Sequence, residues 1–471
     1  MTKHLPPRVL GTFTIAMITV AAIVSLKNLP LSAVFGLSSV FYFVVAALVF
    51  FIPIALVTAE LASTWPKAGG NYIWVGEAFG KPVGFFALWM AWMESIAWFP
   101  TILAFTAAML AHLIAPVFPG LENSKFFYFI VMLSVFWGGT FLNFLGIETS
   151  GWVSTLGVIS GTIIPGALII GLGLWWWMVG HQCCIDFSWS MLIPDFHLDN
   201  MVFFSGILLG LAGVEVAAFH IRESKNPQKT YPKALAIAAL IILTISILGT
   251  LAIAIVVPQQ DISLLSGIIQ AFTEFLKPFN MLWAVPVLAG LALIGSLAGI
   301  NTWTVGPAKG LLVTAEDGFL PKHMKRVNEK GVPVGMLIFQ AVVGTLLSFV
   351  FLRMDSHSAA YWVLTALSAQ FTVVQYILVF AAALWLRYKK PEVHRAFKVP
   401  GGNITMWVIT VIGIAACLFG FWIVFVPPSQ LQTGDQTEYQ LMLVISFIIL
   451  ALLPLYMSEV RRRKLKSVKK S

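Results

Sequence analysis

The sequence predicts an all-α integral membrane protein with about twelve transmembrane helices. Hydrophobic residues make up 59% of the 471 residues, charged residues only 10%, and the mean hydropathy is +0.90. A soluble domain carries roughly 25% charged residues. About twelve apolar segments can each cross roughly 30 Å of hydrocarbon at about 1.5 Å per residue. These observations exclude a soluble protein.

The apolar segments follow one another without a long polar insertion, so a single transmembrane domain accounts for residues 1–471. The first six predicted spans cover residues 9–37, 39–63, 82–115, 126–145, 152–179 and 201–221. The second six cover residues 234–257, 282–312, 334–352, 360–386, 404–426 and 441–456. A basic tail, residues 457–471, completes the chain.

The basic residues predict the orientation of these spans. If the N-terminus is cytoplasmic and the spans alternate, roughly 25 of the 29 basic residues face the cytoplasm, as the positive-inside rule requires. Only Lys125, Lys277 and Arg353 fall outside. Both termini are therefore expected in the cytoplasm. The net charge of +9 follows from this bias and from the tail, which would contact anionic membrane lipid. It is no evidence for nucleic-acid binding.

The sequence predicts no metal site, no cofactor and no enzyme activity. Its histidines have no metal-ligand spacing on one helix face, and no nucleophile and base can be assigned to a common site. The three cysteines, Cys183, Cys184 and Cys417, form no disulfide framework. The oligomeric state is not predicted.

Two apolar segments contain residues that interrupt a helix. The first contains Ser25-Leu26-Lys27-Asn28-Leu29-Pro30, and the sixth contains Gly206, Gly210 and Gly213. Each opens a possible five-helix half, about residues 9–180 and 200–388, with extra helices over about 404–456. Broken backbone at membrane depth is tolerated where it lines a cavity, and paired breaks in two inverted halves point to a transporter site. Gly and Pro are also common in membrane helices without such a role.

Three motifs carry a family resemblance. Residues 59–74 read AELASTWPKAGGNYIW, the sixth segment and its exit contain GLAGVEVAAFHIRESKNP, and the eighth contains TWTVGPAKGLLVTAEDGFLP. Together they resemble permeases of the amino acid, polyamine and organocation (APC) superfamily. The elements AGVEVAAFH, Trp303 with Gly306-Pro307, and KGVPV most resemble the branch of glutamate/γ-aminobutyrate antiporters. In the first motif, Glu60 is expected to be structural and to end the second helix.

The resemblance implies a LeuT-type fold, with a 5+5 inverted repeat and discontinuous helices one and six. It places an amino-acid site at these breaks, formed by Ala21, Ala22, Ile23, Val24, Ser25, Gly210, Gly213, Trp303 and Tyr361. Helix termini there would receive the substrate's carboxylate and ammonium. The usual Gly-Ser-Gly element of helix one is replaced here by Ala21 to Ser25, which puts the backbone geometry of the carboxylate site in doubt.

Three ionisable residues lie deep in the predicted spans, where an unpaired charge is costly. Lys27 could bind an anionic group of the substrate, replace a coupling cation, or pair with Glu94 or Glu215. Glu215 matches the family's helix-six glutamate, which implies coupling of protonation to gating; the alternative is a hydrogen bond to the broken backbone. Glu94 is a second candidate for coupling, or the partner of Lys27.

The resemblance therefore implies a secondary amino-acid transporter of the cell inner membrane that works by alternating access. Exchange of the glutamate/γ-aminobutyrate type is the first expectation, and its partners would be a small amino acid and membrane lipid. The alternative is proton-coupled uptake of a neutral or other amino acid. A nutrient receptor is less expected, because a soluble signalling extension is not seen.

Overall fold

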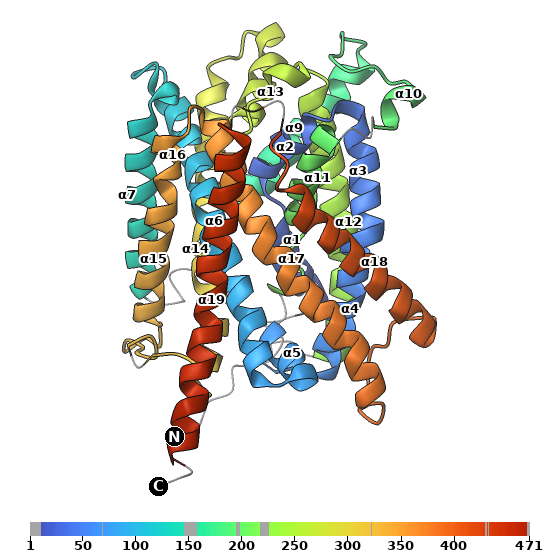
Figure 1. The fold of residues 1–471 in the computed structure, drawn as a ribbon. Coiled ribbons are helices and arrows are strands. Elements are labelled where there is room, and N and C mark those ends of the chain that lie inside the picture. The colour runs from blue at the N-terminus through green and yellow to red at the C-terminus, as the bar shows by residue number, and fades with distance from the viewer. Residues whose placement is uncertain are drawn as a thin grey trace.

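The computed structural model describes residues 11–67, 69–145, 157, 159–194, 198–216, 226–321, 323–428, 431 and 433–468. The described chain is built from helices that run lengthwise through one bundle (Figure 1). Among these residues, ten helices are long and apolar enough to cross a membrane, and the bent pair formed by residues 12–23 and 26–33 makes eleven. The expected all-α membrane architecture is confirmed.

The elements of the first half are short at the start of the chain and long afterwards. They are α1 (Thr12–Ile23), η1 (Leu26–Asn28), α2 (Leu29–Ala33), η2 (Gly36–Ser38), α3 (Ser39–Ala46), the π-helical η3 (Ala47–Phe51), α4 (Ile52–Thr64), α5 (Asn71–Phe79), α6 (Lys81–Ile114), η4 (Leu121–Asn123), α7 (Lys125–Phe144), the π-helical η5 (Ile159–Ile163), α9 (Ile164–Met178) and α10 (Trp189–Leu192).

The second half begins with the sixth apolar segment. Its elements are α11 (Leu198–Gly210), α12 (Pro227–Ala254), η7 (Gln259–Asp261), α13 (Gly267–Leu276), η8 (Lys277–Phe279), α14 (Ala284–Glu316), α15 (Val334–Ser348), α16 (Val350–Arg353), α17 (His357–Lys389), α18 (Gly402–Ile423) and α19 (Gln436–Val468).

Most predicted spans agree with these bounds to within a few residues. The start of the fifth span and the end of the sixth lie outside the described residues, and the count of twelve and the inverted repeat stay predictions. Three details differ. The second helix continues past Glu60 to Thr64, α12 begins at Pro227, seven residues before the predicted start, and the last helix continues beyond Tyr456 to Val468. Hydropathy did not reveal the extensions of α12 and of the last helix, because these turns carry polar residues outside the apolar segments.

The first segment is broken as predicted. The α-helix ends at Ile23, and Val24 and Ser25 adopt extended backbone conformations before η1 begins. The helical parts on either side of this break are bent by 42°. No side chain caps η1 at Ser25, so the amides at its start have no side-chain acceptor.

The sixth segment also loses its helix in mid-course. After Gly210 the chain makes turns through Val216, and residues 217–225 are not described. Gly213 has φ = +113°, a conformation that side-chain-bearing residues rarely adopt. The predicted interruption of this segment is therefore present, and Gly213 is required for its geometry.

Helices α6 and α17 form the centre of the bundle. In the apolar stretch of α6, 78% is buried inside the structure, and in that of α17, 72% is buried. In the apolar stretch of α19, only 11% is buried. The two central helices pack against each other, and α6 also packs along α14. The helices that meet the broken segments are therefore shielded, while α19 presents most of its surface to the surroundings, as a lipid-facing helix does.

Close backbone contact joins the fifth and eighth segments. A Cβ atom built on Gly161 would lie 2.0 Å from the backbone nitrogen of Gly295. No side chain fits between the two backbones at this point. Small residues permit such close approach of membrane helices, so η5 and α14 are held at a distance that depends on both glycines.

One end of the bundle carries most of the described basic loops and is called the basic end. It contains α5, the α14–α15 connection and the C-terminal ends of α17 and α19, whereas α10, α13 and α16 lie at the opposite end (Figure 1). At the basic end, Arg387 donates to both carboxylate oxygens of Glu60, with Nε to Oε1 at 2.8 Å. Arg395 approaches the same carboxylate at 3.2 Å, and the Val399 amide donates to it at 2.8 Å.

A second cluster at the basic end joins α19 to α14. Arg461 donates from Nε to the backbone oxygen of Asp317 at 2.7 Å and lies 4.2 Å from the ring centre of Phe319. Burial acts to raise the pKa of the Asp317 carboxyl, but hydrogen bonds from Lys81 and Tyr72 and the charges of Lys81 and Arg461 outweigh it and hold that pKa below its usual value. This part of α19 is therefore attached to the bundle.

We predict that Arg387→Met destabilises the protein by roughly 3–5 kcal/mol, because it leaves the buried Glu60 carboxylate short of its main partner. The side chains of Arg387 and Glu60 are only 1% and 3% exposed. Thermal unfolding in detergent measures the effect. The control is Arg353→Met, which removes an ion pair whose side chains are 78% and 60% exposed. Equal shifts in the two variants would contradict the prediction.

We predict that Asp317→Asn lowers the thermal stability at neutral pH by a few degrees. The folded carboxyl has a depressed pKa, so its stabilisation is complete above its unfolded pKa of about 3.9 and is lost as the pH falls through the folded value. The melting difference between wild type and variant should be constant from pH 5 to pH 8 and should shrink below about pH 4. A difference that grows on acidification would oppose this assignment.

Candidate functional site

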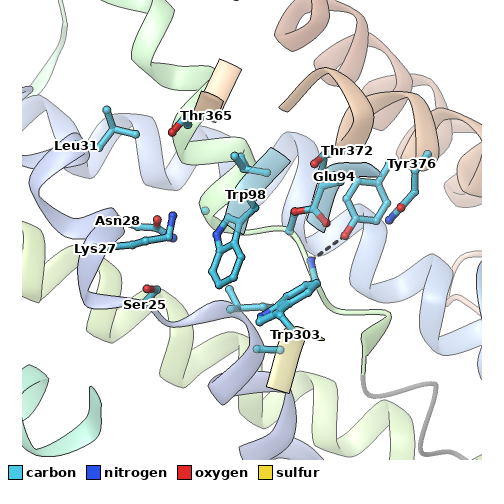
Figure 2. Close-up of a pocket in the computed structure, with 18 of the residues that line it drawn as sticks. Ser25, Lys27, Asn28, Leu31, Glu94, Trp98, Trp303, Thr365, Thr372 and Tyr376 are labelled. Atoms are coloured by element: carbon cyan, nitrogen blue, oxygen red, sulfur yellow. Dashed lines mark hydrogen bonds between the residues drawn. The ribbon is translucent and has the colours of Figure 1, made fainter. Parts of the chain in front are cut away.

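A cavity lies between the two broken segments and the two central helices. Its wall includes Ala22, Ile23 and Ser25 from the first break, Gly210 and Gly213 from the second, and residues of α6, α14 and α17 (Figure 2). The cavity is thus lined by irregular backbone at membrane depth, which is tolerated where it faces a cavity or protein. It also brings together three ionisable side chains, those of Lys27, Glu94 and Glu215.

Helix α6 presents one polar and aromatic face to this region. Glu94, Trp98 and Thr101 are spaced by four and three residues, so they lie on one side of the helix. Seven residues of α-helix rise about 10 Å. Glu94 therefore lies about two turns closer to the basic end than Thr101 does, with Trp98 between them along the helix.

Lys27 is buried, with 2% of its surface exposed. Its ammonium donates to Thr101 Oγ1 at 3.2 Å and lies 5.1 Å from the ring centre of Trp98 and 5.4 Å from that of Tyr361. The Tyr361 hydroxyl donates to the Lys27 carbonyl at 3.3 Å. We call Thr101, Trp98 and Tyr361 the lysine cage. Aromatic faces attract a cation at these distances.

Of the three alternatives for Lys27, the ion pair with Glu94 or Glu215 is not seen among the described residues. Among the described residues, no carboxylate lies within 4.0 Å of the Lys27 ammonium. In Figure 2, the ring of Trp98 lies between Lys27 and Glu94. The two charges therefore face different parts of the same cavity.

Glu215 has two strong donors from α17. Gln375 Nε2 donates to Oε1 and the Tyr376 hydroxyl donates to Oε2, both at 2.6 Å. The same hydroxyl accepts the Gly213 amide at 2.8 Å. Tyr376 therefore connects the backbone of the sixth segment's break to the Glu215 carboxylate. On the other side of the break, the Tyr231 hydroxyl donates to the Val214 carbonyl at 2.9 Å.

Glu94 has fewer partners. Its Oε2 accepts from Ser95 Oγ at 3.3 Å, and its backbone oxygen accepts from Ser368 Oγ at 3.0 Å. Its carboxylate therefore keeps acceptor capacity for a group that enters the cavity. The cavity has a cationic part at Lys27 and an acidic part at Glu94 and Glu215.

A second cavity adjoins the first and shares Ala22, Ser25, Trp98 and Trp303 with it. The rings of Trp98 and Trp303 are 5.7 Å apart between centroids. Ala21 and Val24 face this second cavity, which extends toward α14 and η5. The five predicted residues of the first break thus divide between two neighbouring cavities.

All but one of the predicted site residues line one of the two cavities. The exception is Tyr361, which belongs to the lysine cage: its ring faces the Lys27 ammonium, and its hydroxyl donates to the Lys27 carbonyl. Two other polar residues of α17 lie nearby: Ser368 donates to the Glu94 backbone oxygen, and Gln370 is buried without lining the first cavity. Leu209 of α11 lines the first cavity. Within the described parts of the chain, no group of three or more His, Cys, Asp and Glu could hold a metal.

Sequence reasoning missed the residues that hold the charged groups, namely Trp98, Thr101, Gln375 and Tyr376. Spacing offered a signal for Trp98, Thr101 and Tyr376. Trp98 and Thr101 follow Glu94 at intervals of one helical face, and Thr365, Thr372 and Tyr376 continue the face that begins at Tyr361. The first set shares the face of a candidate acid, so a search by helical face would have found it.

We predict that Tyr376→Phe loosens the break in the sixth segment. The buried Gly213 amide loses its acceptor, at a cost of roughly 1–3 kcal/mol. Hydrogen exchange should accelerate at residues 211–216. The control is Tyr439→Phe, which removes a buried hydroxyl that donates to Val424 and accepts from Trp362 away from the cavity. Faster exchange at residues 211–216 in the control as well would oppose a specific role for Tyr376.

Comparison with known proteins adds to this geometry. The amino acid permease family matches residues 10–448. A protein of Legionella pneumophila described as an uncharacterized transporter is 46% identical over 95% of this chain and 96% of its own length. A glutamate/gamma-aminobutyrate antiporter of Lactococcus lactis is 30% identical over 97% of this chain and 91% of its own length.

A more distant relative has a different named substrate. A probable agmatine/putrescine antiporter of Lactococcus lactis is 26% identical over 89% of this chain and 88% of its own length. These relatives are transporters, in line with the expectation that the chain is not an enzyme. The family match spans nearly the whole chain, and the broken helices enclose a buried cavity. The chain is therefore a multi-pass membrane transporter that belongs to the amino acid permease family of the APC superfamily, with a LeuT-type fold.

Proposed function

We propose that this protein exchanges amino acids of the glutamate/γ-aminobutyrate type by alternating access. The relative with that printed activity aligns over almost the full length of both chains. The observation that carries the proposal is the cavity between the two breaks, because it offers a cationic and an acidic part to one small zwitterion. Charged groups of a buried substrate need such partners.

The substrate's carboxylate would bind near the first break. Lys27 supplies a positive charge there, and the uncapped amides at the start of η1 supply donors. The N-terminus of a helical segment favours an anion. A distal carboxylate, such as the side chain of glutamate, would suit the Lys27 ammonium.

The substrate's ammonium would bind toward the acidic part. Glu94 retains acceptor capacity. The carbonyls at the end of α1 add acceptors near Ile23, because the last carbonyls of a helix lack helical partners. Gly210, Gly213 and Trp303 form the facing wall. The bound molecule would thus contact both broken segments, whose tilting would open one side of the cavity at a time.

Glu215 would couple protonation to gating. Its carboxylate accepts hydrogen bonds from Gln375 and Tyr376, and the latter residue holds the Gly213 amide. Protonation would remove an acceptor from this network and weaken the connection between α17 and the break. Glu94 faces the same cavity, so the loss of the negative charge on Glu215 would change the electrostatic field at the Glu94 carboxylate.

The orientation follows from charge. We place the basic end in the cytoplasm, with both termini on that side of the cell inner membrane. The cationic part of the cavity would then lie toward the outside and the acidic part toward the cytoplasm.

Uptake of radiolabelled glutamate into proteoliposomes tests the proposal. Liposomes preloaded with glutamate or γ-aminobutyrate should take up label, and empty ones should not, because exchange requires a counter-substrate. Uptake by empty liposomes under an imposed proton gradient would indicate proton-coupled uptake instead. No uptake under any condition would exclude glutamate and call for a panel of other amino acids.

We predict that Glu215→Gln reduces exchange by roughly tenfold or more, since a neutral amide cannot gain and lose the proton. The matched control is Glu438→Gln, an exposed acid whose partner is Arg353 at the end opposite the basic end. The initial rate of exchange at pH 5.5 and pH 7.5 is the measurement. A variant with the wild-type rate and pH dependence would remove Glu215 from the coupling role.

A further inference from the structure

The charges in the cavity follow an order along the bundle. Lys27 is held at the level of Thr101, and Glu94 lies two turns of α6 closer to the basic end. Tyr376 lies on the same side as Glu94 (Figure 2), because α17 runs from the opposite end toward the basic end (Figure 1). Glu215, which accepts from Gln375 and Tyr376, therefore lies on that side as well. A ligand that fills the cavity therefore meets a cation at one pole and carboxylates at the other.

The lysine cage holds the Lys27 ammonium through one hydroxyl group and two aromatic rings. Thr101 accepts one hydrogen bond, and the rings of Trp98 and Tyr361 face the ammonium at 5.1 and 5.4 Å. No described carboxylate lies within 4.0 Å of it. Its field therefore acts on whatever occupies the adjoining space, and because the site is buried, that field is weakly screened.

We propose that Lys27 is a charge-selection residue that admits molecules with one ammonium and one carboxylate and rejects diamines; this proposal rests on the function proposed above. A zwitterion places its carboxylate at Lys27 and its ammonium at Glu94. A diamine satisfies Glu94 with one end but brings its second ammonium to the lysine cage, where like charges repel. Chain length alone does not separate the two classes, since γ-aminobutyrate and putrescine are similar in length.

Lys27 would thus act in two ways: it attracts the carboxylate of a zwitterion and repels the second ammonium of a diamine. The same residue would also fix the direction in which the substrate lies, with the carboxylate away from the basic end. Lys27 therefore determines both the substrate class and the orientation of the bound molecule.

The test compares wild type with Lys27→Met, which removes the charge and keeps much of the chain length, and with Lys27→Arg, which keeps the charge. γ-Aminobutyrate and putrescine are the ligands, and purified protein in detergent is titrated with each, with thermal stabilisation as the readout. In wild type, γ-aminobutyrate should bind more tightly than putrescine by on the order of tenfold to a hundredfold. Lys27→Met should gain putrescine binding, and Lys27→Arg should not.

Tyr361→Phe is a matched variant within the cage. It removes the hydroxyl that binds the Lys27 carbonyl but keeps the ring that faces the ammonium. It should therefore still reject putrescine. Lys277→Met, at an exposed position in η8 away from the cavity, should leave all binding unchanged. If Lys27→Met does not fold, Lys27→Gln serves as the neutral variant.

The proposal is overturned if wild type binds putrescine as well as γ-aminobutyrate, or if the folded neutral variant gains no putrescine binding. Failure of the proposed substrate gives a different result: wild type then binds neither glutamate nor γ-aminobutyrate. Charge selection is still tested in that case, because gained putrescine binding by Lys27→Met does not require those ligands. Arginine and agmatine, which differ by one carboxylate, give a second comparison in the same assay.

Discussion

The rest of the structure depends on how the interrupted backbone of the sixth segment satisfies its polar groups. Lipid offers no hydrogen bonds, so an amide or carbonyl freed from a helix at membrane depth must find a partner in the protein or in a cavity. Tyr376 accepts the Gly213 amide, and Tyr231 donates to the Val214 carbonyl. Two tyrosines from different helices therefore replace helical bonds. The break can exist only where α12 and α17 are packed against it, which also fixes where the cavity forms.

The charged side chains inside the described bundle are of two kinds, and their surroundings separate them. Glu60 is fully engaged, with a bidentate arginine, a second arginine and a backbone amide around it. Such a group has no capacity left for a ligand and serves to join α4 to the end of α17. Glu94 and Lys27 are only partly engaged, by hydroxyl groups and aromatic rings. Incomplete satisfaction inside a cavity is what a site for a charged small molecule requires.

The sequence predicted the membrane architecture well, because hydropathy depends on local composition. It also predicted both interruptions, since Gly213 and the run from Ser25 to Pro30 are locally poor in helix propensity. It did not identify the partners of the charges. The contact between residues 213 and 376 joins distant parts of the chain, and the choice between an acid and a Thr-aromatic cage for Lys27 depends on side-chain packing. The arginine partners of Glu60, which are more than 300 residues away in sequence, were not identified for the same reason.

The attachment of Arg461 has a consequence for the C-terminal helix. The guanidinium binds the end of α14 and lies against Phe319, whose ring stacks on Phe85 of α6 at 4.7 Å. Arg461, which lies beyond the last apolar segment, thus connects the exposed α19 to α14 and, through Phe319, to α6. A chain shortened at Tyr456, where the apolar segment ends, would lose these contacts, so the folded unit extends beyond the segment that hydropathy identifies.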